Sequence, residues 1–333
     1  MAVAVVAGGT AGLGRAVVRA LADDGWDVAV LARGEARLAA TVDEVRVRGR
    51  RSVGLSTDVA DAAAVEAAAD RIEAELGPID LWVNGPVTFV HAEFLDIDPD
   101  DFELITDVTY HGTVNGTRAA LSRMVPRDRG HVIQTTSALS HRGMPLMAAY
   151  SAAKAAERIF SESVRSELLH ARSAVRISQV DMPALNTPLY SWMKTRLPHH
   201  SRPLPIVFQP EVGARVIARV ARHPRPRTWV GEPTVAAILG NRVAGGLLDH
   251  LAARFGYRLQ QAPDAAEPML PPNLHSPGEA TVDAHGIFDD KAVSWSPQAW
   301  AVQHRGVAYG MLAIGTAAGL ALTGRRGRRL RRS

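Results

Sequence analysis

Short apolar runs rich in Val and Ile alternate with longer, Ala-rich amphipathic segments over the first 231 residues of this chain. Short apolar runs bounded by turn residues predict buried strands, whereas longer segments with helical spacing predict helices. Strands that alternate with helices are typical of βαβ units, which place helices on both faces of a parallel sheet. We therefore predict an α/β fold with a doubly wound parallel sheet of about seven strands.

Strands are predicted at residues 3–7, 27–32, 52–56, 81–83, 131–135, 175–180 and 228–230. Helices are predicted near residues 12–24, 35–48, 61–76, 99–125, 148–171 and 210–222. Residues 184–208 interrupt this rhythm with several prolines and aromatic side chains. They follow a strand on the side where open α/β sheets bind ligands, so they are predicted either to cover a substrate or to form a surface connection.

Composition excludes several classes of function. The chain has no cysteine, which excludes disulfides, thiolate metal sites and cysteine nucleophiles. His199 and His200 are adjacent and lack a carboxylate cluster, so no metal site is predicted. The net charge of +4 includes six arginines in the last nine residues, which leaves the rest of the chain slightly acidic. A nucleic-acid partner is therefore not expected.

A glycine-rich turn, "VVAGGTAGLGRAV", follows the first predicted strand and opens the first helix. Gly8, Gly12 and Gly14 permit a tight turn, and they let a pyrophosphate lie against backbone N–H groups at a helix N-terminus. Thr10 and Leu13 belong to the same turn. Because the turn stands between a strand and a helix within a βαβ unit, it predicts a Rossmann-type dinucleotide site.

The end of the second strand indicates which dinucleotide is bound. NAD sites usually place an acidic residue there for the ribose 2′-hydroxyl, whereas NADP sites offer an arginine to the 2′-phosphate. The sequence "DVAVLARGEAR" places Arg33 at this point, so NADP(H) is preferred. Glu35, two residues on, leaves NAD(H) as the alternative. Asp58 and Val59, after the third strand, are predicted to meet the adenine.

Three further residues form a candidate catalytic set. Ser137 follows the fifth main predicted strand in "VIQTTSALS", and "YSAAK" begins thirteen residues later. Tyr150 and Lys154 are four residues apart in an Ala-rich segment, so they share one face of a helix. A lysine ammonium one turn away favours the phenolate, and is predicted to lower the tyrosine pKa towards neutrality. Such a tyrosine suits acid–base catalysis beside a carbonyl oxygen.

Together these motifs resemble the classical short-chain dehydrogenase/reductase (SDR) family over residues 1 to about 231. The resemblance implies a dinucleotide-binding catalytic domain in which Tyr150 transfers the proton, Ser137 orients the substrate oxygen and Lys154 holds the nicotinamide ribose. It implies an oxidoreductase acting on a small-molecule carbonyl or secondary alcohol, in a homo-oligomeric assembly. The apolar and aromatic residues of the 184–208 segment predict that this substrate is hydrophobic. Epimerisation or dehydration on the same scaffold is the related alternative.

The chain departs from the family pattern at several positions. "VNGPV" keeps Asn84 of the family's N-N-A-G motif and replaces the rest. Thr109 stands where the family has a helix asparagine, to which a water-mediated proton relay is attributed. Pro183 is followed by Ala184, and Thr187 is predicted to meet the nicotinamide carboxamide. These changes keep open a nucleotide-binding scaffold or sensor with impaired catalysis.

Beyond residue 231 the alternation stops. Residues 232–300 are predicted to form an extension that is partly helical and partly Pro-rich, and residues 301–333 an apolar helix with an Arg-rich tail. The uncharged run 306–324 and the arginines predict contact with a membrane surface through residues 306–333, against a soluble packing or dimerising helix. The N-terminus is interpreted as a first strand and not as a signal peptide, which predicts a cytoplasmic protein.

Overall fold

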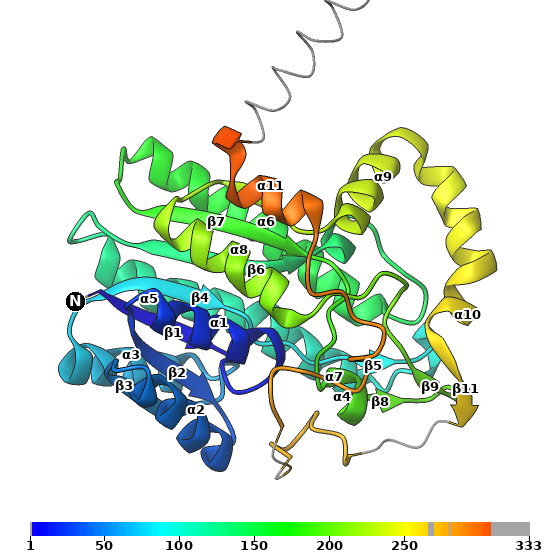
Figure 1. Ribbon diagram of the computed structural model, residues 1–333, viewed down its shortest axis with the longest axis horizontal. Coiled ribbons are helices and arrows are strands. Elements are labelled where there is room, and N and C mark those ends of the chain that lie inside the picture. Colours follow the sequence, from blue (N-terminus) through cyan, green and yellow to red (C-terminus); the bar gives the residue numbers. More distant parts are fainter. Residues whose placement is uncertain (1, 266–269, 279, 281, 308–333) are drawn as a thin grey trace, which may run out of the picture.

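A computed structural model describes residues 2–265, 270–278, 280 and 282–307. Seven parallel strands form a central sheet in the order β10-β7-β6-β4-β1-β2-β3 (Figure 1). Their bounds are β1 Val3–Ala7, β2 Asp27–Ala32, β3 Ser52–Ser56, β4 Ile79–Asn84, β6 His131–Ser137, β7 Arg176–Met182 and β10 Arg227–Trp229. The predicted doubly wound sheet is thereby confirmed, with every predicted strand present.

Helices cover both faces of this sheet. The bounds of those that pack on it are α1 Gly12–Asp23, α2 Glu35–Val47, α3 Ala62–Leu76, α5 Gly112–Met124, α6 Ala148–His170 and α8 Pro210–Arg222. One apolar core joins α1, α2 and α8 to one face, and a second joins α3, α5 and α6 to the other. Alternate residues of β1 enter the two cores, as the two-residue period of a strand requires.

The helix predicted over residues 99–125 differs from the observed structure. It consists of α4 (Pro99–Thr106), a π-helical turn (Asp107–His111) and α5. Such turns insert one extra residue into a helix and are frequent at functional sites. Thr109 lies in the middle of this turn, so the local geometry of the helix changes at the position where the sequence departs from the family pattern.

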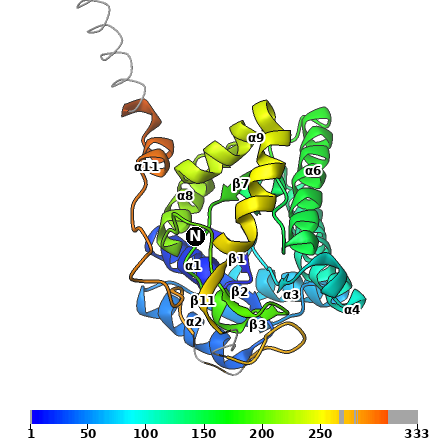
Figure 2. The same ribbon diagram turned by 90° about the vertical axis from the view of Figure 1, so that its right-hand side faces the viewer.

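The segment after β7 folds over the carboxyl edge of the sheet. It contains α7 (Leu189–Trp192), β8 (Lys194–Thr195), which pairs with β5 (Val90–His91), and β9 (His199–Ser201), which pairs with β11 (Gln261–Ala265). Helix α9 (Glu232–Leu251) continues through a π-helical turn (Ala252–Gly256) into α10 (Tyr257–Leu259), beside the body of the sheet (Figure 2).

The C-terminal extension returns along the molecule as an arm. Its described residues between 270 and 296 pass below the glycine turn and lead to α11 (Pro297–Gln303), which packs near α8 (Figure 1). Most of the predicted apolar segment and the arginine tail, residues 308–333, lie outside the described residues. Within the described part of the chain, no helix has the length and apolar character needed to cross a membrane.

Candidate active site

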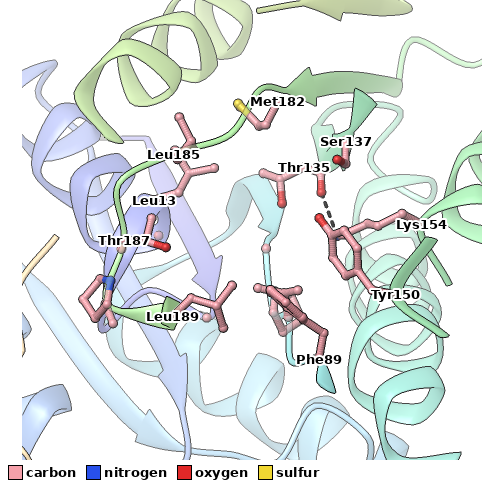
Figure 3. A pocket seen from close by; sticks show the side chains of 18 of the residues that line it. Leu13, Phe89, Thr135, Ser137, Tyr150, Lys154, Met182, Leu185, Thr187 and Leu189 are labelled. Atoms are coloured by element: carbon pink, nitrogen blue, oxygen red, sulfur yellow. Dashed lines mark hydrogen bonds between the residues drawn. The ribbon is translucent and has the colours of Figure 1, made fainter. Parts of the chain in front are cut away.

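A cavity of about 410 Å³ opens at the carboxyl ends of the parallel strands. This edge is where open α/β sheets bind their ligands, because the chain reverses its winding there. The glycine turn and Arg33 line one end of the cavity, and Ser137, Tyr150 and Lys154 line the other. Figure 3 shows these three side chains on the opposite side of the pocket from Leu13 and Thr187.

The glycine turn is shaped so that only glycine fits. Gly8 and Gly12 have φ angles of +80° and +55°, which L side chains rarely adopt. A Cβ on Gly14 would collide with the backbone carbonyl of Gly8. The turn lies at the N-terminus of α1, a position that fits the pyrophosphate of a dinucleotide. The Gly12 N–H at this position donates a hydrogen bond to the Asp283 carbonyl of the arm (3.2 Å). Thr10 and Leu13 line the cavity at this turn.

Two arginines lie at the end of the cavity formed by β2 and α2. The Arg33 guanidinium donates hydrogen bonds to the carbonyls of Asn273 (2.8 Å) and Leu274 (3.2 Å) of the arm. Arg37, which is 8% exposed, donates to the Gly278 carbonyl (2.6 Å). Burial, together with the charges of Arg33 and Arg15, lowers the pKa of Arg37. The arm therefore covers a concentrated positive charge.

Ser137 and Tyr150 meet at the other end of the cavity. Ser137 ends β6 in extended conformation, and its Oγ accepts a hydrogen bond from the Leu139 backbone N–H (3.1 Å). Tyr150 lies in the first turn of α6, where it interacts with Ser137 through a side-chain hydrogen bond. Its ring packs against Phe89 with centroids 5.3 Å apart. Phe89, which also lines the cavity, thus packs against the Tyr150 ring.

Lys154 lies one helical turn after Tyr150 and is 3% exposed. Its Nζ donates to the Thr135 backbone carbonyl at 2.9 Å and to both carboxylate oxygens of Glu157 at 3.0 Å. Glu157 is 1% exposed and has not been identified by any motif. The cation expected to act on Tyr150 therefore has a buried carboxylate as its direct partner.

The pKa of Tyr150 is the point at which the electrostatic prediction from the sequence is wrong. Burial raises the pKa above its ordinary value of 10, and this effect outweighs the lowering by the charge of Lys154 and the hydrogen bond with Ser137. The charge of Glu157 adds to the rise. The ammonium is evident from the sequence, whereas the desolvation of the ring and the carboxylate behind the lysine arise only in the folded chain.

Two predicted residues occupy other places. The Asn84 side chain accepts from Trp82 Nε1 (2.8 Å) and donates to Gln134 Oε1 (2.9 Å), so it is buried beneath the turn instead of lining the cavity. Thr109 is fully buried, and its Oγ1 has no hydrogen-bond partner among the described residues. Neither residue lines the cavity, and the Asn84 side chain is directed towards α5, where its Nδ2 donates to Thr117 Oγ1 (3.2 Å).

The remaining predicted cofactor residues line the cavity. Asp58 and Val59 lie after β3, and Pro183 and Thr187 lie after β7. Several lining residues carry no signal in the sequence motifs: Phe89, Arg37, Asn273 and Pro277. The last two belong to the arm, and only the folded chain brings them to the site.

Comparison with known proteins identifies relatives among the short chain dehydrogenases and oxidoreductases. A family model described as short chain dehydrogenase matches residues 2–196. The uncharacterized oxidoreductase YxnA of Bacillus subtilis is 27% identical over 280 residues, which cover 83% of this chain and 78% of that protein.

Solved structures share the fold. An alcohol dehydrogenase from the archaeon Thermococcus sibiricus, complexed with 5-hydroxy-NADP, matches with a TM-score of 0.59 and 24% identity over 69% of this chain and 95% of that chain. A short chain dehydrogenase from Mycobacterium paratuberculosis bound to NAD gives a TM-score of 0.60 and 23% identity over 69% and 96%. Because the family model spans more than half of the sequence, this chain belongs to the short chain dehydrogenase family of oxidoreductases.

Proposed function

We propose that the protein is an NADP(H)-dependent oxidoreductase that transfers hydride between the nicotinamide and a carbonyl or secondary alcohol. One observation carries this proposal: Ser137, Tyr150 and Lys154 converge at one end of a cavity whose other end is the glycine turn. A dinucleotide bound with its pyrophosphate at the turn is long enough to bring its nicotinamide to these side chains. The bound nicotinamide supplies the hydride.

In this proposal the chain's own residues handle the proton. Ser137 donates a hydrogen bond to the substrate oxygen and fixes its position, and Tyr150 donates the proton as negative charge develops on that oxygen. The raised pKa of Tyr150 keeps the phenol protonated near neutral pH, which favours its role as acid in carbonyl reduction. Lys154 stabilises the phenolate left behind, and it lies where it can hold a ribose hydroxyl.

The arginines support NADP(H) over NAD(H). Arg37 Nε is buried without a hydrogen-bond partner among the described residues, and the guanidinium lies 5.5 Å above the Trp192 ring. A buried donor without a partner is costly unless a ligand accepts from it. Glu35, the residue that kept NAD(H) open, is exposed and does not line the cavity. A 2′-phosphate would accept a hydrogen bond from Arg37 Nε and form an ion pair with Arg33.

Apolar side chains around Tyr150 suggest a hydrophobic substrate. Phe89, Met147 and Tyr190 belong to one buried cluster against which Tyr150 packs, and all line the cavity. Leu189 and Ile206, from the segment after β7, line the same cavity. Apolar walls with a few convergent polar groups are typical of pockets that bind small molecules. We therefore propose that residues 184–208 form the wall that contacts the substrate.

The test is the Tyr150→Phe variant in a screen of hydrophobic ketones and aldehydes followed by NADPH consumption. We expect turnover to fall by at least about 100-fold because the acid is lost, while NADPH binding stays within a factor of about two. Tyr257→Phe, on the exposed α10, is the matched control. Unchanged turnover in Tyr150→Phe would refute the assignment. Binding of NADPH with no turnover of any panel member by the unmodified protein would favour the scaffold alternative.

A further inference from the structure

A buried carboxyl group lies directly behind the catalytic lysine. Glu157 follows Lys154 by three residues on α6, does not line the cavity, and faces α5 at the interior of the protein. A buried carboxylate is rare unless it is paired, because leaving water is costly for a charge. Glu157 is paired with the one lysine that the proposed chemistry uses. Its position therefore calls for a functional explanation.

The hydrogen bonds of Lys154 are directed to Glu157 and to the backbone. Both Glu157 oxygens lie 3.0 Å from Nζ, and the third acceptor is the Thr135 carbonyl at 2.9 Å. A lysine ammonium has three protons to donate. Glu157 thus fixes the position of Nζ and offsets part of the charge that acts on Tyr150.

A threonine on α5 completes the arrangement. Thr113 Oγ1 lies 3.0 Å from Glu157 Oε1 and 2.9 Å from the Thr109 backbone carbonyl. A hydroxyl has only one proton, so it cannot donate to both acceptors at once. When Glu157 is ionised, Thr113 donates to the carboxylate. When Glu157 is protonated, its O–H donates to Thr113, which turns its own proton to the Thr109 carbonyl. The geometry satisfies both protonation states of Glu157.

The second acceptor belongs to the π-helical turn, at the position where the family resemblance leads one to expect an asparagine. Thr109 has no amide, and its Oγ1 is buried without a partner in the described structure. Its backbone carbonyl nevertheless accepts from Thr113. The chain that links Lys154 to this turn therefore consists of side chains of the protein, with Glu157 and Thr113 as its members.

We propose that Glu157 is a positioning residue that holds Lys154 and stores the proton with which Tyr150 is restored after each reduction. This proposal rests on the proposed function. In reduction, the nicotinamide's hydride goes to the carbonyl carbon and the Tyr150 proton to its oxygen, leaving a phenolate. Lys154 then turns one of its N–H bonds from Glu157 towards the phenolate and gives that proton to Tyr150, while the Glu157 carboxyl gives its own proton to Lys154. The phenol is restored, Glu157 is left ionised, and it regains a proton from solvent between turnovers.

The charges around Glu157 are consistent with this role. Lys154 is the cation that faces it, and Tyr150 is the titratable group beyond, while Thr113 and Thr135 are the neutral neighbours from α5 and β6. Other charged groups pair elsewhere: Arg158 with Glu162 (2.9 Å), and His111 with Asp107 at the surface (2.7 Å). Burial raises the pKa of Glu157 to about 7, against the lowering by Lys154 and Thr113.

The first test measures Tyr150 directly and needs no substrate. Tyrosinate absorbance is titrated in the full chain and in Glu157→Gln, and the matching Tyr150→Phe titration is subtracted from each. The Glu157 charge raises the Tyr150 pKa. When glutamine removes that charge, the phenolate becomes the counter-ion of Lys154, which favours ionisation of Tyr150. We expect the midpoint of Tyr150 to move to lower pH by about one to three units. Coincident midpoints in two folded proteins would overturn the proposal.

The second test is the pH dependence of carbonyl reduction with NADPH. Reduction by the unmodified enzyme is expected to fall as pH rises through about 7, because Glu157 then lacks its stored proton. Glu157→Gln is expected to lose this fall in rate, the alkaline limb of the pH profile, and to lower kcat with little change in KM. The matched control is Glu162→Gln, on the same helix but paired with Arg158, which should keep the limb. Persistence of the limb in Glu157→Gln would contradict proton storage.

Thr113→Val provides a second variant should Glu157→Gln fail to fold. It removes the hydroxyl that stabilises the carboxylate, so the limb near neutrality should move to higher pH; an unmoved limb would contradict the arrangement. Failure of the proposed function has a different signature. In that case Tyr150→Phe would be fully active, while the tyrosinate titration would still report the coupling of Glu157 to Tyr150.

Discussion

Substitution of Gly14 by alanine tests the binding of the dinucleotide at its most constrained point. The new Cβ would lie far inside 3.0 Å of the Gly8 carbonyl oxygen and at 3.0 Å from Gly9 Cα, whereas ordinary contact begins at 3.4 Å. Both neighbours are backbone atoms, which cannot rotate away. The turn would therefore have to open by roughly 1 Å, a change that typically costs about 1–3 kcal/mol of stability.

The effect on binding follows from the hydrogen bonds that the turn offers. Opening the turn should displace two backbone N–H donors from a pyrophosphate, and each bond to a charged group contributes about 1.5 kcal/mol. A loss of about 3 kcal/mol corresponds to a Kd for NADPH that is weaker by about 100-fold. Titration of NADPH fluorescence measures the Kd, and thermal unfolding measures the stability.

A matched glycine variant separates the two effects. Gly240→Ala changes a glycine in α9 whose new Cβ would meet only the Leu248 side chain, at 3.5 Å. We expect it to bind NADPH normally and to unfold at or slightly above the original temperature, because alanine favours helix. If Gly14→Ala bound NADPH as tightly as Gly240→Ala, the turn would not be the pyrophosphate site and the reasoning would be refuted.

Three further predictions concern the cofactor, the substrate and acid stability. Arg33→Ala should weaken NADPH binding by about 10- to 100-fold and change the affinity for NADH by no more than about twofold. The control is Arg46→Ala, which removes an exposed ion pair with Asp43. Equal losses of affinity for the two cofactors would exclude a contact between Arg33 and the 2′-phosphate. Ser137→Ala should reduce kcat at least about tenfold with NADPH affinity retained, and an unchanged kcat would remove Ser137 from the site. Burial lowers the pKa of His91 and of His131 to about 4, so the unfolded chain takes up protons before the folded one as pH falls below about 6.5. Denaturant titrations should therefore show a falling free energy of unfolding between pH 6.5 and 4. A constant free energy of unfolding across that range would contradict the burial of neutral imidazoles.

The sheet could be predicted because its signal is local. Each strand is a short apolar run, and each helix that covers it has the spacing of an amphipathic segment, so alternation along the chain translates directly into layers in space. The convergence of the proposed catalytic residues was equally accessible. Ser137 ends a strand, and Tyr150 and Lys154 share a helix face, so their convergence needs only the parallel sheet and the 3.6-residue period.

The arm could not be predicted in this way. Asn273 and Pro277 line the cavity from more than 200 residues beyond the glycine turn, and their segment has no periodicity that would place it. Arg33, predicted to meet the cofactor, lines the cavity, but its hydrogen bonds to the arm carbonyls depend on the path of that segment. Contacts of this kind follow from tertiary packing, which the local sequence does not encode.

Glu157 lies between these two cases. Its spacing of three residues from Lys154 makes the two neighbours on α6, but a glutamate on an Ala-rich helix would ordinarily face solvent. Thr113 of α5 contacts the Glu157 carboxylate in the interior, and Gly116 of the same helix lies close to Trp82 and Asn84 of β4. A Cβ on Gly116 would strike Asn84 Oδ1, so the same close packing turns the Asn84 amide inward. The two departures from expectation, Asn84 buried beneath the turn and Glu157 behind Lys154, thus both involve contacts with α5, and in both cases the contact is with Thr113.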